Sequence, residues 1–200
     1  MVLLVAVTSA RRVSELQALS IIEPFLTIFQ DRVVLRTDPG FLPKVASAFH
    51  RTQEIVLPTF CPNPSGPKER DFHTLDVKRC LVHYLEITSE FRKANSLFVL
   101  FSGARKGYGA SKNTLARWLC MAIHEAYKAM DIEPPKGVVA HSTRAMATSW
   151  AERAGASPEN ICKAATWTSF STFTRHYRMD LLAAAGQSFG RKVLQAVVPP

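Results

Sequence analysis

The sequence predicts one mostly α-helical domain that also contains a small antiparallel β-sheet. Several stretches repeat apolar residues at helical spacing, as amphipathic helices do. Within residues 29–48, a run rich in valine and leucine precedes a Pro-Gly turn, which predicts a strand from Arg32 to Arg36 and a second extended piece after the turn. With 200 residues, 47% of them apolar, the chain is long enough to bury a single core, so we expect residues 1–200 to form one domain.

The chain is strongly basic. It has 25 Lys and Arg residues against 16 Asp and Glu residues, which gives a net charge of +9. This excess suggests a polyanionic partner. Basic proteins without a nucleic-acid role are common, so the charge by itself leaves both possibilities open.

The cysteines and the first residues indicate the compartment. Cysteines 61, 80, 120 and 162 are far apart and form no C-x-x-C pair, so we expect free thiols rather than disulfides or a zinc site. The segment MVLLVAVTSA is too short to span a bilayer and has no basic leader. We therefore expect an intracellular protein with no membrane partner, and we interpret residues 1–10 as the end of a buried helix whose beginning is truncated.

A second helix is predicted directly after this segment. Thr8 or Ser9 can cap it, and Val13, Leu16 and Leu19 form its buried stripe.

Within that helix, Arg12 and Glu15 are three residues apart and can meet on one side. The carboxylate can then orient the guanidinium, although an ordinary surface ion pair has the same spacing.

The middle of the chain contains fewer candidate functional residues. Residues 49–72 are rich in proline and predict loops, and residues 73–92 have the apolar spacing of a helix. The run 97–102 has β character and leads into a basic, glycine-bearing loop and a helix from about residue 112, in which Trp118, Met121 and Ala122 are expected in the core. Four basic side chains here can contact phosphates or be merely solvated: Arg105, Lys106, Lys112 and Arg117.

The stretch from His141 to Tyr177 contains the most specific pattern. It opens with His-x-x-Arg and continues as a helix that Gly155 can stop. Ser157 and Pro158 begin a second helix that Trp167 closes. In the segment that follows, Phe170, Phe173 and Tyr177 fall on one helical face.

These residue types suit the attack of a phenol on a phosphodiester. Tyrosine forms covalent intermediates in enzymes. A planar guanidinium can hold two oxygens of the pentavalent phosphate, and imidazole and indole N–H groups can donate to the rest. The imidazole can instead move a proton.

The order and spacing of these residues resemble the tyrosine recombinase (phage integrase) family. Trp167 lies 23 residues after Arg144, and Tyr177 lies ten residues after Trp167. In that family the order is Arg, Lys, His-x-x-Arg, His or Trp, and then the nucleophilic Tyr. The segment FLPK and the tryptophan at the third motif are most similar to recombinases of DIRS-like eukaryotic retroelements. The resemblance runs from Val7 to Met179 and covers only the family's catalytic domain, without its upstream DNA-clamping domain.

The resemblance implies a role for each matching residue. Arg12 is the first arginine, because only it has Glu and Leu at the motif's offsets, while Arg11 is the competing assignment. Lys44, the only lysine in 29–48, is the general acid, although a solvated lysine is the alternative. By the same resemblance, Glu15 supports the first arginine, Arg144 clamps the scissile phosphate together with Arg12, and Tyr177 is the nucleophile. His141 and Trp167 support the phosphate and the proton transfers.

The resemblance also implies an activity and its partners. We expect DNA breakage and rejoining through a 3′-phosphotyrosyl link, without metal or other cofactor. The expected partner is double-stranded DNA, bound by a homo-oligomer in the nucleus. Two alternatives stay open: an activity like that of type IB topoisomerases, and a catalytically inactive DNA-binding remnant of a mobile element.

Overall fold

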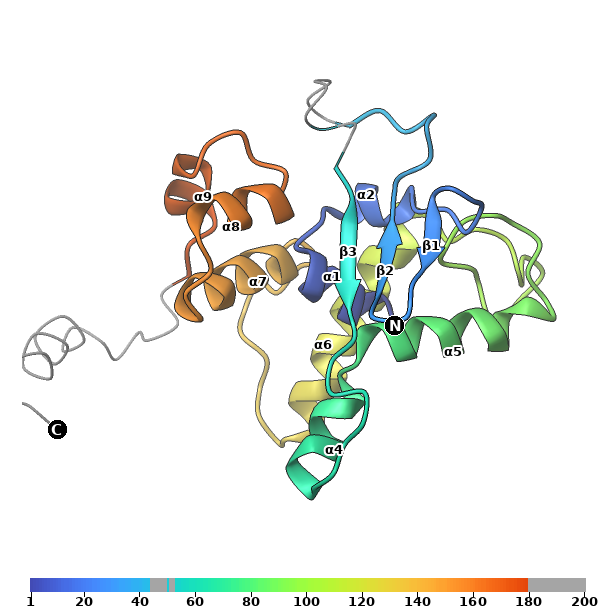
Figure 1. Ribbon diagram of the computed structural model, residues 1–200, viewed down its shortest axis with the longest axis horizontal. Helices are drawn as coiled ribbons and strands as arrows, with labels where there is room; N and C mark the ends of the chain where they lie inside the picture. The colour runs from blue at the N-terminus through green and yellow to red at the C-terminus, as the bar shows by residue number, and fades with distance from the viewer. Residues whose placement is uncertain (44–49, 51–52, 180–200) are drawn as a thin grey trace, which may run out of the picture.

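A computed structural model of the chain describes residues 1–43, 50 and 53–179 (Figure 1). It contains a three-stranded antiparallel sheet in the order β1–β2–β3. The strands are β1 (Leu26–Ile28), β2 (Arg32–Leu35) and β3 (Ile55–Pro58). In the register, Val33 pairs with Ile28 on one side and with Leu57 on the other.

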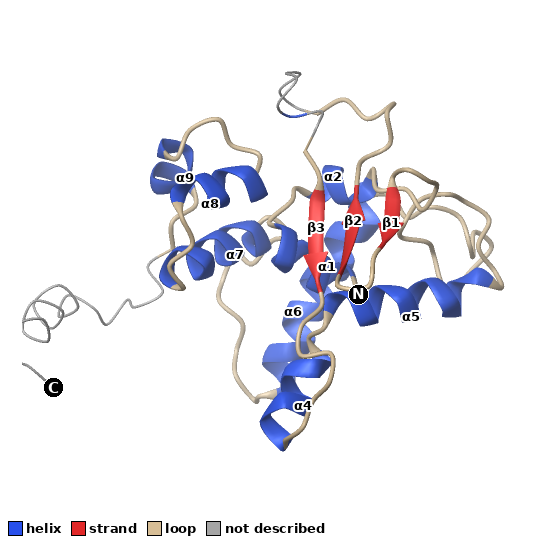
Figure 2. Ribbon diagram, in the orientation of Figure 1, coloured by secondary structure: helices blue, strands red, loops and turns tan. Residues whose placement is uncertain are grey.

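The other regular elements that the structure describes are α-helices, and this helix-rich arrangement with a small antiparallel sheet confirms the predicted fold class. The helices are α1 (Val2–Ser9), α2 (Val13–Gln17), α4 (Pro67–Thr74), α5 (Val77–Ser89), α6 (Lys112–Ala129), α7 (Ser142–Arg153), α8 (Pro158–Ala164) and α9 (Ser171–His176). Figure 2 shows α7, α8 and α9 on one side of the strands, and α4 projecting away from the sheet. Within the described ranges, no helix is both long and apolar enough to cross a lipid bilayer.

The first helix, α1, packs against elements from several parts of the chain. α1 contacts α5, α6, α7 and β3. Its Val5 and Ala6 are fully buried in the main core, which also takes apolar side chains from the sheet, α5 and α6. A second, smaller core lies under α7, α8 and α9, and Val7 of α1 packs against it. α1 therefore joins the two cores.

Several local predictions were wrong. Strand β3 lies in the stretch predicted as loops, because only its pairing with β2 identifies so short a strand. Thr8 and Ser9 do not begin a helix. They end α1, where their hydroxyls donate to Leu4 O (2.7 Å) and Val5 O (2.6 Å). Met121 is 55% exposed rather than in the core.

The basic loop before α6 is tightly held to its neighbours. Gly107 N donates to Leu100 O, and Gly107 O accepts from Lys93 N. Gly107 has φ of +86°, and a Cβ there would lie 1.9 Å from Phe91 O. Glycine is therefore required twice at this position, for its backbone conformation and for the space. The loop presents Arg105 and Lys106 to solvent from a fixed backbone.

We expect Gly107→Ala to destabilise the protein by more than about 2 kcal/mol, because a left-handed alanine adds about 1 kcal/mol of strain to the clash with Phe91. Gly103 is the matched control. It also has positive φ, +76°, but a Cβ there meets nothing within 4 Å, so Gly103→Ala should cost only about 1 kcal/mol. Urea unfolding at equilibrium measures both. Equal losses would show that Phe91 does not constrain the loop.

Candidate active site

α7 carries the first two candidate residues of the site. The helix begins at Ser142, and His141 occupies its N-cap position. Arg144 follows one turn later on the face that packs against α1. His141 is exposed, whereas the Arg144 side chain is fully buried. The His-x-x-Arg spacing therefore places one residue at the surface and the other beneath it.

α8 positions the tryptophan. Ser157 caps the helix by accepting from Asn160 N (3.2 Å), and Pro158 fills its first position, as predicted. The helix ends at Ala164 with Ala165 as its C-cap, and Trp167 follows two residues later as a buried side chain that is 4% exposed.

α9 then brings the tyrosine to the indole. Phe173 is fully buried and stacks on Trp167 with ring centroids 5.9 Å apart. Tyr177 ends the helix, and its ring centroid lies 4.6 Å from that of Trp167. The predicted face of Phe170, Phe173 and Tyr177 packs in the smaller core and so fixes the tyrosine ring.

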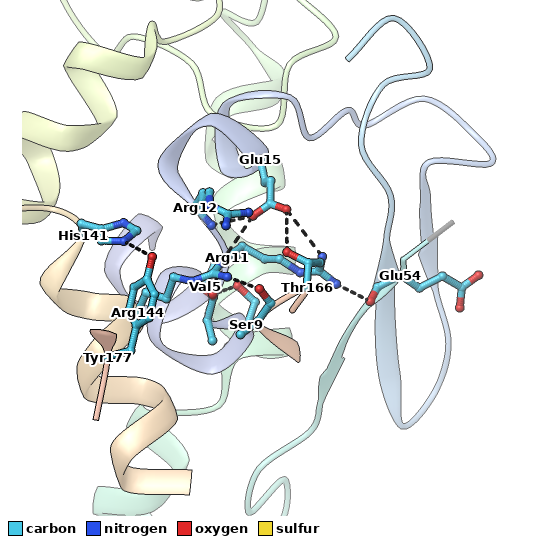
Figure 3. Close-up of polar contacts among 12 residues, drawn as sticks. Val5, Ser9, Arg11, Arg12, Glu15, Glu54, His141, Arg144, Thr166 and Tyr177 are labelled. Carbon is cyan, nitrogen blue, oxygen red and sulfur yellow. Dashed lines mark hydrogen bonds and ion pairs between the residues drawn. The ribbon is translucent and has the colours of Figure 1, made fainter. Parts of the chain in front are cut away.

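The tyrosine hydroxyl meets the exposed histidine. His141 Nε2 and Tyr177 Oη are 2.9 Å apart, a hydrogen bond in which the histidine tautomer sets the donor (Figure 3). Burial lowers the pKa of His141 below its ordinary value of 6.5, and the charges of Arg144 and Arg12 lower it further. A histidine that stays neutral at pH 7 can accept the phenolic proton.

The Arg144 guanidinium is enclosed by main-chain carbonyls and aromatic rings. Nη1 donates to Ala10 O (3.0 Å), and Nη2 donates to Ala165 O. The guanidinium carbon lies 4.8 Å from the centroid of Trp167 and 5.6 Å from that of Tyr177. Burial lowers the pKa of Arg144 to about 10, helped by Arg12 and opposed by Glu15, so the side chain remains charged at pH 7.

Glu15 is the carboxylate at the centre of the cluster. Its Oε2 atom accepts from Arg12 N (2.7 Å) and lies 3.7 Å from Arg144 Nη1. Its Oε1 atom accepts from Thr166 Oγ1 (3.2 Å) and lies 3.8 Å from Arg11 Nη1. Figure 3 shows these contacts converging on one carboxylate. The sequence predicts that Glu15 orients the Arg12 guanidinium, but its ion pairs are with Arg11 and Arg144, and it holds Arg12 through the main chain.

The two adjacent arginines differ in their surroundings. Arg11 is buried, at 5% exposure, and its Nη2 donates to Glu54 O (3.0 Å) just before β3. Arg12 is half-buried, and its charge lowers the pKa values of both His141 and Arg144. Arg12 is thus the arginine that faces the exposed histidine, and Arg11 ties α2 to the sheet.

Three buried donors in the cluster lack acceptors among the residues that the structure describes. They are Trp167 Nε1, Arg144 Nε and Arg11 Nε. A buried N–H group without an acceptor is costly and rare, so each such group in a native fold needs an explanation.

The other predicted site residues are more distant or outside the described part. Lys44 falls outside the described residues. Arg105, Lys106, Lys112 and Arg117 are all exposed. Figure 1 places the loop that carries Arg105 and Lys106 on the opposite side of the strands from α7–α9, whereas Lys112 and Arg117 lie in α6. Among the described residues, no three His, Cys, Asp or Glu side chains are grouped so that they could hold a metal ion, and the four cysteines are free thiols.

Sequence reasoning missed Thr166 and the burial of Arg11. Thr166 follows the end of α8 with φ of +50°, a conformation that sequence rules assign to glycine. The burial of Arg11 depends on two contacts. One is with Glu54, which lies just before β3, and the other is with Glu15, one helical turn further along the chain.

We expect Glu15→Gln to destabilise the fold by about 3 kcal/mol, because it leaves two buried guanidinium groups without a counter-charge. Asp31→Asn is the matched control. It removes the carboxylate of the exposed Arg32–Asp31 pair and should change stability by less than about 1 kcal/mol. Urea unfolding at pH 7 measures both variants. A loss for Glu15→Gln as small as the control's would show that the carboxylate does not balance the buried charges.

Comparison with known proteins identifies solved structures that have a similar fold. No protein-family model matches the sequence, and no curated protein matches it. Solved structures do match: XerA recombinase (TM-score 0.59, 15% identity over 98% of this chain) and the Tn1549 transposon integrase in complex with a circular intermediate DNA (TM-score 0.57, 14% identity over 95%). A lambda integrase dimer bound to a COC′ core site also matches (TM-score 0.53, 17% identity over 91%).

The chain spans 57%, 57% and 52% of the lengths of these three structures. Because the identities are low, the likeness concerns the fold. The helix-rich chain with its small antiparallel sheet has the fold of the catalytic domain of tyrosine recombinases.

Proposed function

We propose that the chain breaks and rejoins DNA through a covalent 3′-phosphotyrosyl intermediate, in site-specific recombination or integration. The observation that carries this proposal is the contact between His141 Nε2 and Tyr177 Oη, 2.9 Å apart, with Arg144 and Trp167 against the tyrosine ring. The sequence predicts that these residues, separated by up to 36 positions, meet at one site, and an arbitrary helical protein has no reason to gather them.

In the proposed reaction, Tyr177 is the nucleophile. A phenol normally ionises near pH 10, so attack at neutral pH needs a base or strong stabilisation of the product charge. Neutral His141 can take the proton as the phenolic oxygen bonds to phosphorus. The bond from phosphorus to the 5′ oxygen breaks, and that oxygen needs a proton, for which we propose Lys44. Rejoining is the same sequence in reverse.

The cationic cluster supplies the stabilisation. Arg12 and Arg144 provide positive charge where the phosphate oxygens become more negative. Trp167 Nε1 and Arg144 Nε are donors without described acceptors, which suits hydrogen bonds to those oxygens. The Nη atoms of Arg144 already donate to Ala10 and Ala165, so a phosphate would compete with these carbonyls or be reached through Nε.

The partner we propose is double-stranded DNA, bound by a homo-oligomer on a mobile element of the DIRS-like kind, in the nucleus. The Tn1549 integrase and lambda integrase structures contain DNA. The net charge of +9 and the exposed residues Arg105, Lys106, Lys112 and Arg117 fit the same partner. The alternative is a DNA-binding remnant without cleavage, and the complete burial of Arg144 favours it.

Trapping on a nicked suicide substrate tests the reaction. The DNA should carry the element's own ends, and a DNA-clamping domain should be supplied in trans or by fusion. We expect the unmodified protein to form a covalent adduct and Tyr177→Phe to form none, while DNA affinity stays within about twofold, because the change removes one oxygen and keeps the ring.

Two further variants sharpen this test. Arg144→Lys keeps the charge but loses the planar fork, so it should slow adduct formation by about 100-fold or more with a much smaller effect on binding. His176→Ala is the control beside the nucleophile, because His176 is exposed and points about 100° away around the helix. It should be mild. An adduct with Tyr177→Phe would exclude Tyr177 as the nucleophile, and no adduct with the unmodified protein would favour the remnant.

DNA affinity should depend steeply on salt, through the basic loop and the start of α6. We expect the combined variant Arg105→Ala, Lys106→Ala and Lys112→Ala to flatten the plot of log affinity against log salt by about 0.9 per lost phosphate contact. The matched control removes three other exposed lysines, Lys68, Lys128 and Lys136, and lowers the net charge equally. Fluorescence anisotropy with labelled duplex DNA measures both. Identical slopes for the two variants would remove the loop from the interface.

A further inference from the structure

Two helices in this chain end in the same way but with different residues. The C-cap residue of α7, Ala154, is followed by Gly155 with φ of +87°, and the C-cap residue of α8, Ala165, is followed by Thr166 with φ of +50°. In both, the next amide closes the turn to a carbonyl five residues earlier: Ala156 N to Ala151 O (2.9 Å), and Trp167 N to Cys162 O (2.8 Å). Glycine is the ordinary residue here, because it takes the left-handed conformation without strain.

Thr166 is therefore an exception that needs a cause. Of the four non-glycine residues with positive φ in the described part of the chain, only Thr166 is β-branched, the class for which this conformation is least favourable. Its side chain is 1% exposed. Strain of this kind persists where surrounding contacts require it, and it occurs often at functional sites.

The contact that requires it is the hydroxyl bond to Glu15. Thr166 Oγ1 donates to Glu15 Oε1 at 3.2 Å, which links the end of α8 to α2 across 151 residues. Glycine would fit the backbone but could not make this bond. The chain thus keeps a hydroxyl at the cost of an unfavourable backbone conformation.

That bond completes a ring of polar contacts around Arg144. Arg144 Nη2 donates to Ala165 O, the residue before Thr166, and Arg144 Nη1 lies 3.7 Å from Glu15 Oε2. The residue after Thr166 is Trp167, whose indole packs on Tyr177. The turn 165–167 therefore contacts the guanidinium, the carboxylate and the tyrosine ring through three successive residues.

We propose that Thr166 is a positioning residue, whose hydroxyl bond to Glu15 fixes the turn that carries Trp167 against Tyr177 and Arg144. The inference rests on the proposed function for its catalytic consequence, but the positioning itself does not depend on catalysis. Without the hydroxyl, Glu15 Oε1 loses this hydrogen-bond donor, and the turn keeps its link to Glu15 through Arg144.

The test uses Trp167 as its own reporter. The chain has three tryptophans, so a Trp118→Phe, Trp150→Phe background leaves Trp167 alone. In this background three variants separate the hydroxyl from the backbone strain. Thr166→Ser keeps the hydroxyl, Thr166→Val keeps the branched shape without it, and Thr166→Gly removes both the hydroxyl and the strain. Gly155→Thr is the matched control, because it introduces the same strain where a Cβ meets nothing within 4 Å.

Acrylamide quenching of Trp167 is the first measurement. We expect Thr166→Ser to stay close to the unmodified protein, and Thr166→Val and Thr166→Gly to raise the quenching constant by about threefold as the buried indole becomes accessible. Gly155→Thr should lower the melting temperature by about 4 °C without changing the quenching. If Thr166→Val does not fold, Thr166→Gly, whose backbone is unstrained, carries the comparison with Thr166→Ser.

Adduct formation on the suicide substrate is the second measurement. Thr166→Val and Thr166→Gly should form adduct about 10- to 100-fold more slowly, with DNA affinity within about twofold, and Thr166→Ser should restore the rate. Quenching in Thr166→Val and Thr166→Gly equal to that in Thr166→Ser would overturn the proposal. If even the unmodified protein forms no adduct, the proposed function fails, and the quenching result still decides the role of Thr166.

Discussion

The enclosure of one guanidinium is the constraint on which the rest of the structure depends. A cation removed from water must find acceptors and a counter-charge inside the protein. Arg144 finds them in three separate segments: Ala10 O after α1, Ala165 O at the end of α8, and the carboxylate of Glu15 in α2. These segments can supply their oxygens only if α1, α2, α7 and α8 take the positions they have.

The electrostatics of the cluster follow from this enclosure. One carboxylate, Glu15, faces the buried cations Arg11 and Arg144, and Arg12 adds a third positive charge nearby. Burial lowers the pKa of His141, and the surplus charge of Arg144 and Arg12 lowers it further, which favours the neutral imidazole beside the tyrosine hydroxyl. A bound anion would relieve the surplus. Such an excess of positive charge is the kind of environment that stabilises developing negative charge.

The sequence predicted the elements that carry local signals. Ser157 and Pro158 begin α8, Gly155 ends α7, and the spacing of Phe170, Phe173 and Tyr177 gives the face of α9, because capping and periodicity act over a few residues. Prediction from the sequence failed for features that depend on contacts between distant parts of the chain. Strand β3 exists through its pairing with β2, and the partners of Glu15 depend on which arginine becomes buried. Thr166 occupies a position where glycine is preferred, and its hydroxyl donates a hydrogen bond to Glu15, 151 residues away. No pattern within one helix can reveal such a contact.

α1 lies between two hydrophobic cores, so it connects two structural units. The sheet, α5 and α6 form one body, and α7, α8 and α9 form another, joined by α1 and by the contacts of Glu15. Local opening in proteins proceeds in cooperative units of this size. Arg144, Trp167 and Tyr177 belong to the smaller unit, and Arg12 belongs to the larger one. Opening of the joint would therefore separate Tyr177 from Arg12 in a single motion.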